Sequence, residues 1–175
     1  VRFALSAIIL AIIFNKKVRS ATKDDIKSGL IVGFFLFIAY SSQTLGVTYA
    51  DPGRSAFLSA SYCVIVPFLS WAVTRHRPDK YNIWAAIIAI IGIYLISKSG
   101  VEKGTSIFNA SKEMLLGDGL ALLSGFLFAA HIVAVNQFTK GKDPILMTIF
   151  QFASAAVLAL SLIHISEPTR LLSIS

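Results

Sequence analysis

Long apolar stretches separated by short polar segments dominate the chain up to about residue 160. A bilayer core about 30 Å thick is crossed by roughly 20 apolar residues of helix. Backbone groups in lipid must be hydrogen-bonded within their own segment, so each stretch is predicted to be helical. The pattern predicts an all-α, polytopic transmembrane helical bundle with six spans. They are 1–14, 29–49, 55–73, 83–97, 117–138 and 144 to about 160.

Prolines lie before or within three of the apolar stretches, at positions that a helix can accommodate. Asp51-Pro52 and Asp143-Pro144 each stand before an apolar stretch. An aspartate can accept hydrogen bonds from the unpaired amides of a helix start, and proline fits the first helical position. Pro67 lies inside a stretch, where we expect it to kink the helix.

Composition supports a bilayer environment. Hydrophobic residues make up 55% of the 175 residues and charged residues only 14%, against about 25% charged in ordinary soluble domains. The net charge is +7, but the basic residues form short clusters between apolar stretches, which disfavours nucleic-acid binding. The lone cysteine, Cys63, cannot form a disulfide framework or a metal cluster within the chain. No cofactor or metal site is therefore predicted.

The distribution of lysine and arginine between alternate loops predicts the orientation, because cytoplasmic loops carry the excess. We expect a multi-pass protein of the cytoplasmic membrane, with its first span running inward. The richer set holds ten basic residues: Lys16, Lys17, Arg19, Lys23, Lys27, Arg75, Arg77, Lys80, Lys140 and Lys142. The other set holds four: Arg54, Lys98, Lys103 and Lys112.

The last part of the chain does not read like the rest. Residues 160–170 resemble the conceptual translation of a transposase-type sequencing adapter, read on from a DNA insert. We therefore expect residues 160–175 to be foreign to the protein, as expression and processing scars are. His164, Glu167 and Arg170 accordingly receive no functional role.

Two segments resemble each other at an offset of five helices. Residues 2–9 read Arg-Phe-Ala-Leu-Ser-Ala-Ile-Ile, and residues 151–158 read Gln-Phe-Ala-Ser-Ala-Ala-Val-Leu. Because five is odd, the two copies must cross the membrane in opposite directions, which agrees with the loop charges. Inverted repeats of this kind are a transporter architecture.

The chain resembles the EamA-type branch of the drug/metabolite transporter superfamily. The order and spacing of several segments carry the likeness, rather than one specific motif. These segments are Arg2-Phe3, Gly33 to Tyr40 with Gln43, Gly46 and Tyr49, Ser55 to Leu58, Val66-Pro67, Gly92 to Ser97, Gly117-Asp118, Phe128 to His131, and Asp143-Pro144 with Gln151.

The resemblance implies ten helices in two inverted five-helix repeats, of which this chain would hold helices two to seven. Residues 1–99 would end the first repeat, 100–116 would form an external linker, and 117–159 would begin the second repeat. Such transporters move small metabolites, amino acids or drugs by alternating access, often exporting them with proton or ion coupling. The expected partners are the lipid bilayer and a small-molecule solute, with a homodimer as a further option.

Two other function classes remain open at this point. A membrane scaffold or oligomerisation protein would suit the glycine ridges described below, but not the inverted repeat. A membrane enzyme is less favoured, because paired acid–base groups or metal ligands at helical spacing are missing from the spans.

The second span is the richest in polar groups. Tyr40, Gln43 and Thr44 recur at three- and four-residue spacing and so share one helix face. Such a stripe should face protein or water rather than lipid. It either lines the solute path or hydrogen-bonds a neighbouring helix. Tyr62 and His131 are weaker candidates for the same path, with His131 a possible proton relay.

Small residues at four-residue spacing form ridges that let helix backbones approach closely. The predicted packing ridges are Gly29 with Gly33, and Gly117 with Ala121, Gly125 and Ala129. Asp118 stands at the start of the same apolar stretch, where we expect it to cap the helix.

Overall fold

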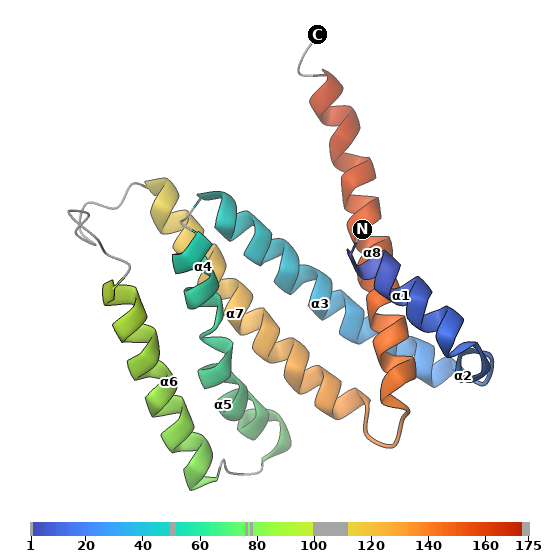
Figure 1. The fold of residues 1–175 in the computed structure, drawn as a ribbon, viewed down its shortest axis with the longest axis horizontal. Helices are drawn as coiled ribbons and strands as arrows, with labels where there is room; N and C mark the ends of the chain where they lie inside the picture. The colour runs from blue at the N-terminus through green and yellow to red at the C-terminus, as the bar shows by residue number, and fades with distance from the viewer. Residues whose placement is uncertain (1, 50–51, 76, 78, 100–111, 173–175) are drawn as a thin grey trace. The chain divides into compact units, whose positions relative to one another are not determined.

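The computed structural model describes residues 2–49, 52–75, 77, 79–99 and 112–172. Every regular element in these residues is a helix (Figure 1). The helices are α1 (Arg2–Ile13), α2 (Asn15–Arg19), α3 (Lys23–Tyr49), α4 (Pro52–Ser59), α5 (Tyr62–Thr74), α6 (Lys80–Ser99), α7 (Lys112–Phe138) and α8 (Pro144–Leu172).

Several helices have the length and composition of membrane spans, which confirms the predicted all-α polytopic bundle. Within the described residues, four segments are long and apolar enough to cross a bilayer: Lys23–Tyr49, Pro52–Thr74, Leu115–Phe138 and Pro144–Leu162. Arg2–Ile13 and Lys80–Gly92 are shorter apolar helices. Most of the 100–116 linker expected from the sequence lies outside the described residues, and α7 begins at Lys112.

The chain forms two compact units. Unit 1 comprises Val1–Phe37 and Ala134–Ser175, and unit 2 comprises Ile38–Val133. In unit 1, α1 lies beside α8 (Figure 1). The rings of Phe3 on α1 and Phe152 on α8 are 5.6 Å apart between centroids. These two residues occupy equivalent positions in the repeated segments.

The first half of α3 packs against α8 in the same unit. Val32, Ala134 and Met147 form its buried apolar core, with Phe35 and Val135 packed against it. A Cβ atom built on Gly29 would overlap the Phe150 Cβ atom. One built on Gly33 would lie 2.6 Å from the Gln151 carbonyl oxygen. Both contacts are shorter than any side chain tolerates, so only glycine allows this approach of the backbones.

Side chains before α3 and α8 accept hydrogen bonds from the first turns of these helices. The Asp143 carboxylate accepts a hydrogen bond from the Ile145 amide at 2.9 Å, which confirms the predicted cap before Pro144. Thr22 and Asp25 bond reciprocally: the Thr22 amide donates to the Asp25 carboxylate at 2.9 Å, and the Asp25 amide donates to the Thr22 hydroxyl at 3.3 Å. This reciprocal pattern stabilises the start of α3. Asp51, the other predicted cap, lies outside the described residues.

In unit 2, the span Pro52–Thr74 is interrupted between α4 and α5 at Ala60 and Ser61. Pro67 lies within α5, and the kink expected there stays a prediction. The Ser61 amide donates to Leu58 and the Cys63 amide to Ala60, each three residues back. These shorter loops tighten the turn.

Glycines on α3 and α7 lie where helices of unit 2 approach closely. A Cβ atom on Gly125 would lie 2.6 Å from the Ser61 hydroxyl and 2.9 Å from the Ser59 carbonyl oxygen, so the α7 backbone reaches the interruption. On α3, a Cβ atom on Gly46 would lie 3.1 Å from the Ala121 nitrogen of α7. Ala121 and Ala129 are fully buried. The close approaches at Gly46 and Gly125, with the burial of Ala121 and Ala129, support the packing role predicted for the α7 ridge.

Replacing Gly33 with alanine should destabilise the protein by about 1–3 kcal/mol, because the added methyl group overlaps the α8 backbone. The matched control is Gly119→Ala on α7, where a Cβ atom would meet nothing within 4 Å. The control should be neutral or slightly stabilised, since alanine favours helix. Unfolding in detergent micelles measures both variants, and an equal loss in the two would contradict the packing.

Candidate solute path

Three helices of unit 2 bring aromatic rings together around Phe128 of α7. The Tyr40 ring of α3 meets the Phe128 ring edge-on, with centroids 5.0 Å apart and planes at 86°. The Tyr62 ring of α5 is 6.1 Å from the same ring. Two residues predicted to line the solute path, Tyr40 and Tyr62, therefore share one neighbour. Phe128 itself was not among the predicted site residues.

The other predicted path residues lie within a helical turn of this aromatic group. Gln43 and His131 are partly buried, whereas Thr44 is exposed. Gln43 follows Tyr40 by three residues, and His131 follows Phe128 by three, so each lies on the same side of its helix as its aromatic neighbour. The Thr44 hydroxyl donates to the Tyr40 carbonyl at 2.8 Å. Thr44 thus directs its donor to its own helix.

A row of polar contacts joins α4 to α7, and we call it the polar seam. The Arg54 guanidinium lies 2.5 Å from the Asp118 carboxylate. The Ser59 and Ser124 hydroxyls are 2.9 Å apart, and Ser124 donates to the Ala121 carbonyl at 2.7 Å. Ser55, next to Arg54, is fully buried. Buried polar groups in a span are expensive unless paired, so the seam holds these helices in one register.

Three oxygens of this region are buried without a hydrogen-bond partner among the described residues: Ser55 Oγ, Ser61 Oγ and Asp118 Oδ1. In globular proteins, buried polar groups of this kind commonly bind ordered water. The seam was not predicted from the sequence. Its available signal was the four-residue spacing of Ser55 and Ser59, which places both hydroxyls on one face of α4.

The predicted role of Asp118 as a helix cap is wrong. The helix begins at Lys112, before the stretch predicted to start at Gly117. Asp118 therefore lies past the first turn, where amides are already bonded within the helix. Its side chain is 12% exposed and pairs with Arg54 instead.

A second group of charged contacts lies in unit 1. Lys17 Nζ of α2 is 2.5 Å from an Asp143 carboxylate oxygen. Lys142 donates to the Ser28 hydroxyl at 2.5 Å and to the Asp24 carbonyl at 2.8 Å. The hydrogen bond from Lys17, followed by that from the Ile145 amide, holds the pKa of Asp143 below its ordinary value.

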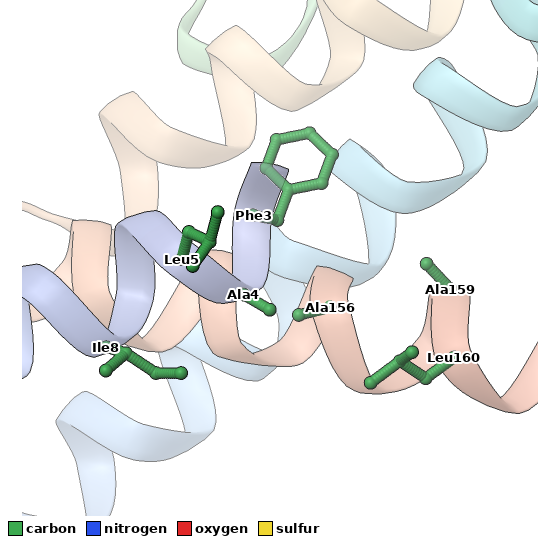
Figure 2. A pocket seen from close by; sticks show the side chains of 7 residues that line it. All are labelled: Phe3, Ala4, Leu5, Ile8, Ala156, Ala159 and Leu160. Carbon is green, nitrogen blue, oxygen red and sulfur yellow. The ribbon is translucent and has the colours of Figure 1, made fainter. Parts of the chain in front are cut away.

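A cavity of about 240 Å³ lies between α1 and α8 in unit 1 (Figure 2). Its lining is apolar throughout and offers no side-chain donor or acceptor. None of the predicted path residues contributes to it. The lining residues are Phe3, Ala4, Leu5, Ile8, Ala156, Ala159 and Leu160.

Comparison with known proteins decides the family. The EamA-like transporter family matches residues 1–98. The chain belongs to this family. An "Uncharacterized transporter" of Archaeoglobus fulgidus is 29% identical over 137 residues, which cover 78% of this chain and 40% of that protein. A second "Uncharacterized transporter" of the same organism is 25% identical over 120 residues, 69% of this chain and 39% of that protein.

The chain thus spans about 40% of the length of these curated relatives. No solved structure matches it. The described residues hold no group of three or more histidine, cysteine, aspartate or glutamate side chains placed to bind a metal ion. The comparisons show the family, and the path residues are argued from geometry.

The Lys17–Asp143 pair should be insensitive to pH near neutrality. The pKa of Asp143 in the folded protein lies below the ordinary value of 3.8. The Lys17–Asp143 pair therefore stabilises the fold fully at pH values above 3.8. The stabilisation is lost only as the pH falls through the lowered pKa. Lys17→Gln should therefore lower the unfolding temperature by the same amount at any pH between about 5 and 8. Lys16→Gln, at the adjacent exposed lysine, is the control and should change little. A Lys17 effect that vanishes at pH 5 would contradict the pairing.

Proposed function

We propose that this protein moves a small metabolite, amino acid or drug across the cytoplasmic membrane by alternating access, in the direction of export. The family membership and the two relatives that carry the name transporter support this proposal. The spanning helices supply the membrane-embedded scaffold that such movement requires.

We further propose an inverted-repeat architecture of ten helices. The matched family range ends at residue 98, next to the repeat boundary expected at 99. Phe3 and Phe152, which are equivalent in the repeated segments, contact each other in unit 1. A contact between equivalent residues is what a two-fold axis between the repeats produces, since residues near such an axis meet their own counterparts.

The convergence of Tyr40, Tyr62 and Phe128 carries the assignment of the solute path. The two phenols combine an apolar ring with a hydroxyl that can donate or accept a hydrogen bond. Placed within spans, such groups favour protein or solute contacts over lipid. Gln43 and His131 add an amide and an imidazole within one turn of these rings. An amphipathic organic solute fits this mixture better than a bare inorganic ion does.

His131 is the candidate for proton coupling in this scheme. Histidine is the side chain that most commonly transfers protons in proteins near neutral pH. It lies on the same side of α7 as Phe128 and is partly buried. Coupling at this position would place the titrating group within a turn of the solute.

Gln43→Ala should reduce transport strongly while the unfolding temperature stays near that of the parent, because a path amide contacts solute rather than a fixed neighbour. Tyr40→Phe should act in the same direction but more weakly, since it removes only the hydroxyl. Leu45→Ala, at a side chain 51% exposed on the same helix, is the control and should transport normally.

The measurement is uptake or efflux of a panel of metabolites, amino acids and drugs, made in vesicles with the protein encoded by the complete gene. A packing role for Gln43 predicts the opposite pattern, with stability lower by about 1 kcal/mol and transport per folded molecule unchanged. That result would remove Gln43 from the path.

A further inference from the structure

Three segments of unit 1 bring basic side chains together at one end of its helices. The segments are α2, the start of α3, and the turn between α7 and α8. Lys17 of α2 pairs with Asp143 of that turn, and Lys142 donates to the Asp24 carbonyl and the Ser28 hydroxyl of α3. We call this region the basic surface, and its basic residues are Lys16, Lys17, Arg19, Lys23, Lys27, Lys140 and Lys142.

The ends of the apolar helices place the basic surface at the boundary of the bilayer. The apolar helix α1 ends at Ile13, directly before α2. The spanning segment of α3 begins at Lys23, that of α7 ends at Phe138, and that of α8 begins at Pro144. Basic side chains just beyond the ends of spanning helices lie at the level of the lipid headgroups.

The acidic side chains of the same segments leave most of this positive charge unpaired. Asp143 is engaged with Lys17, and Asp25 is buried and bonded to Thr22. Among the described residues of the three segments, Asp24 is then the one exposed acidic side chain. The basic side chains that are exposed there are Lys16, Arg19, Lys23, Lys27 and Lys140. The basic surface therefore presents an excess of positive charge.

The contacts of Lys142 bring charges from two distant parts of the chain close together. Both of its acceptors, a backbone carbonyl and a hydroxyl, are neutral, so its charge is not cancelled. Lys23 and Lys27 are four residues apart and share one side of α3. They lie beside the row of Asp24 and Ser28, which hold Lys142. An anion next to Lys142 is accordingly close to two further lysines.

We propose that the basic surface binds the headgroup of an anionic phospholipid. A phosphate group offers several acceptor oxygens and can pair with ammonium groups of different segments at once. The position of the surface favours a lipid over a free anion, because the acyl chains of the same molecule remain in the bilayer and hold the headgroup at this level. Basic pockets between spanning helices bind anionic headgroups in this way.

This inference goes beyond the proposed transport, since none of these residues belongs to the proposed solute path. A bound headgroup would join α2, the start of α3 and the α7–α8 turn, which otherwise depend on few contacts with one another. Because such a ligand binds the folded protein, it stabilises unit 1 against unfolding.

The test uses the protein encoded by the complete gene, purified in a neutral detergent. Its unfolding temperature is followed during titration with short-chain phosphatidylglycerol, with phosphatidylcholine of the same chain length, or with inorganic phosphate. Phosphatidylglycerol should raise the unfolding temperature until the effect saturates. Phosphatidylcholine, which has no net charge, should leave it unchanged. Inorganic phosphate should need a concentration at least about tenfold higher, because it has no acyl chains.

The double substitution Lys23→Gln/Lys27→Gln should weaken the binding of phosphatidylglycerol about tenfold or more, since each basic residue near the surface contributes severalfold. Both side chains are exposed, so the variant should fold like the parent. Lys23→Arg/Lys27→Arg keeps the charge and should retain binding. The matched control is Arg75→Gln/Arg77→Gln, which removes the same charge from exposed residues of unit 2 and should change binding by less than about twofold.

Three results would overturn the proposal. Equal weakening by the two glutamine variants would show a diffuse attraction to positive charge rather than a site. An equal effect of phosphatidylcholine would show that the headgroup charge is not recognised. Saturation by inorganic phosphate at the same concentration as phosphatidylglycerol would identify a site for a free anion instead of a lipid.

Discussion

The close approach of helix backbones at small residues is the constraint on which the described packing depends. Lipid tails are as apolar as leucine side chains, so burial of apolar surface does not draw membrane helices together. Association relies instead on van der Waals contact and on hydrogen bonds between helices. Gly29 and Gly33 bring α3 against α8 in unit 1, and Gly125 brings α7 against the interruption between α4 and α5 in unit 2. Without these approaches, the hydroxyl contacts of the polar seam would be out of reach.

The polar side chains of the described helices lie either buried between closely packed helices or near the helix ends. Ser59 and Ser124 are buried between α4 and α7, and the charged contacts stand near the ends of α3 and α7. The aromatic group around Phe128 occupies the same helices but offers hydroxyl groups rather than full charges. This division suits a transporter. Charges that are costly in lipid stay near the helix ends, while weaker polar groups line the proposed path.

Much of this arrangement was predictable from residue order. The spans could be predicted from the length of the apolar stretches, and the cap at Asp143 from its place before Pro144. Both features depend only on residues that are close together in the sequence. The pairing of Asp118 with Arg54 was not predictable, since it joins residues 64 positions apart and the helix start at Lys112 lies outside the apolar pattern. The interruption at Ala60 and Ser61 was not predicted either, and Gly125 of α7, a residue distant in sequence, closely approaches that turn. Phe128 was not predicted to be a site residue for the same reason. The sequence contains thirteen phenylalanines and does not indicate which of them contacts Tyr40 and Tyr62.

The packing of α3 on α8 in the membrane is the most direct test of this account. Val32 and Met147 are 1% and 3% exposed and belong to one buried cluster. In the Cys63→Ser background, Val32→Cys/Met147→Cys should cross-link readily in native membranes with a short bifunctional thiol reagent. The control Leu30→Cys/Met147→Cys uses a side chain that is 51% exposed and should react far less. Equal cross-linking in the two pairs, or none in the first, would contradict the glycine-mediated packing of α3 on α8.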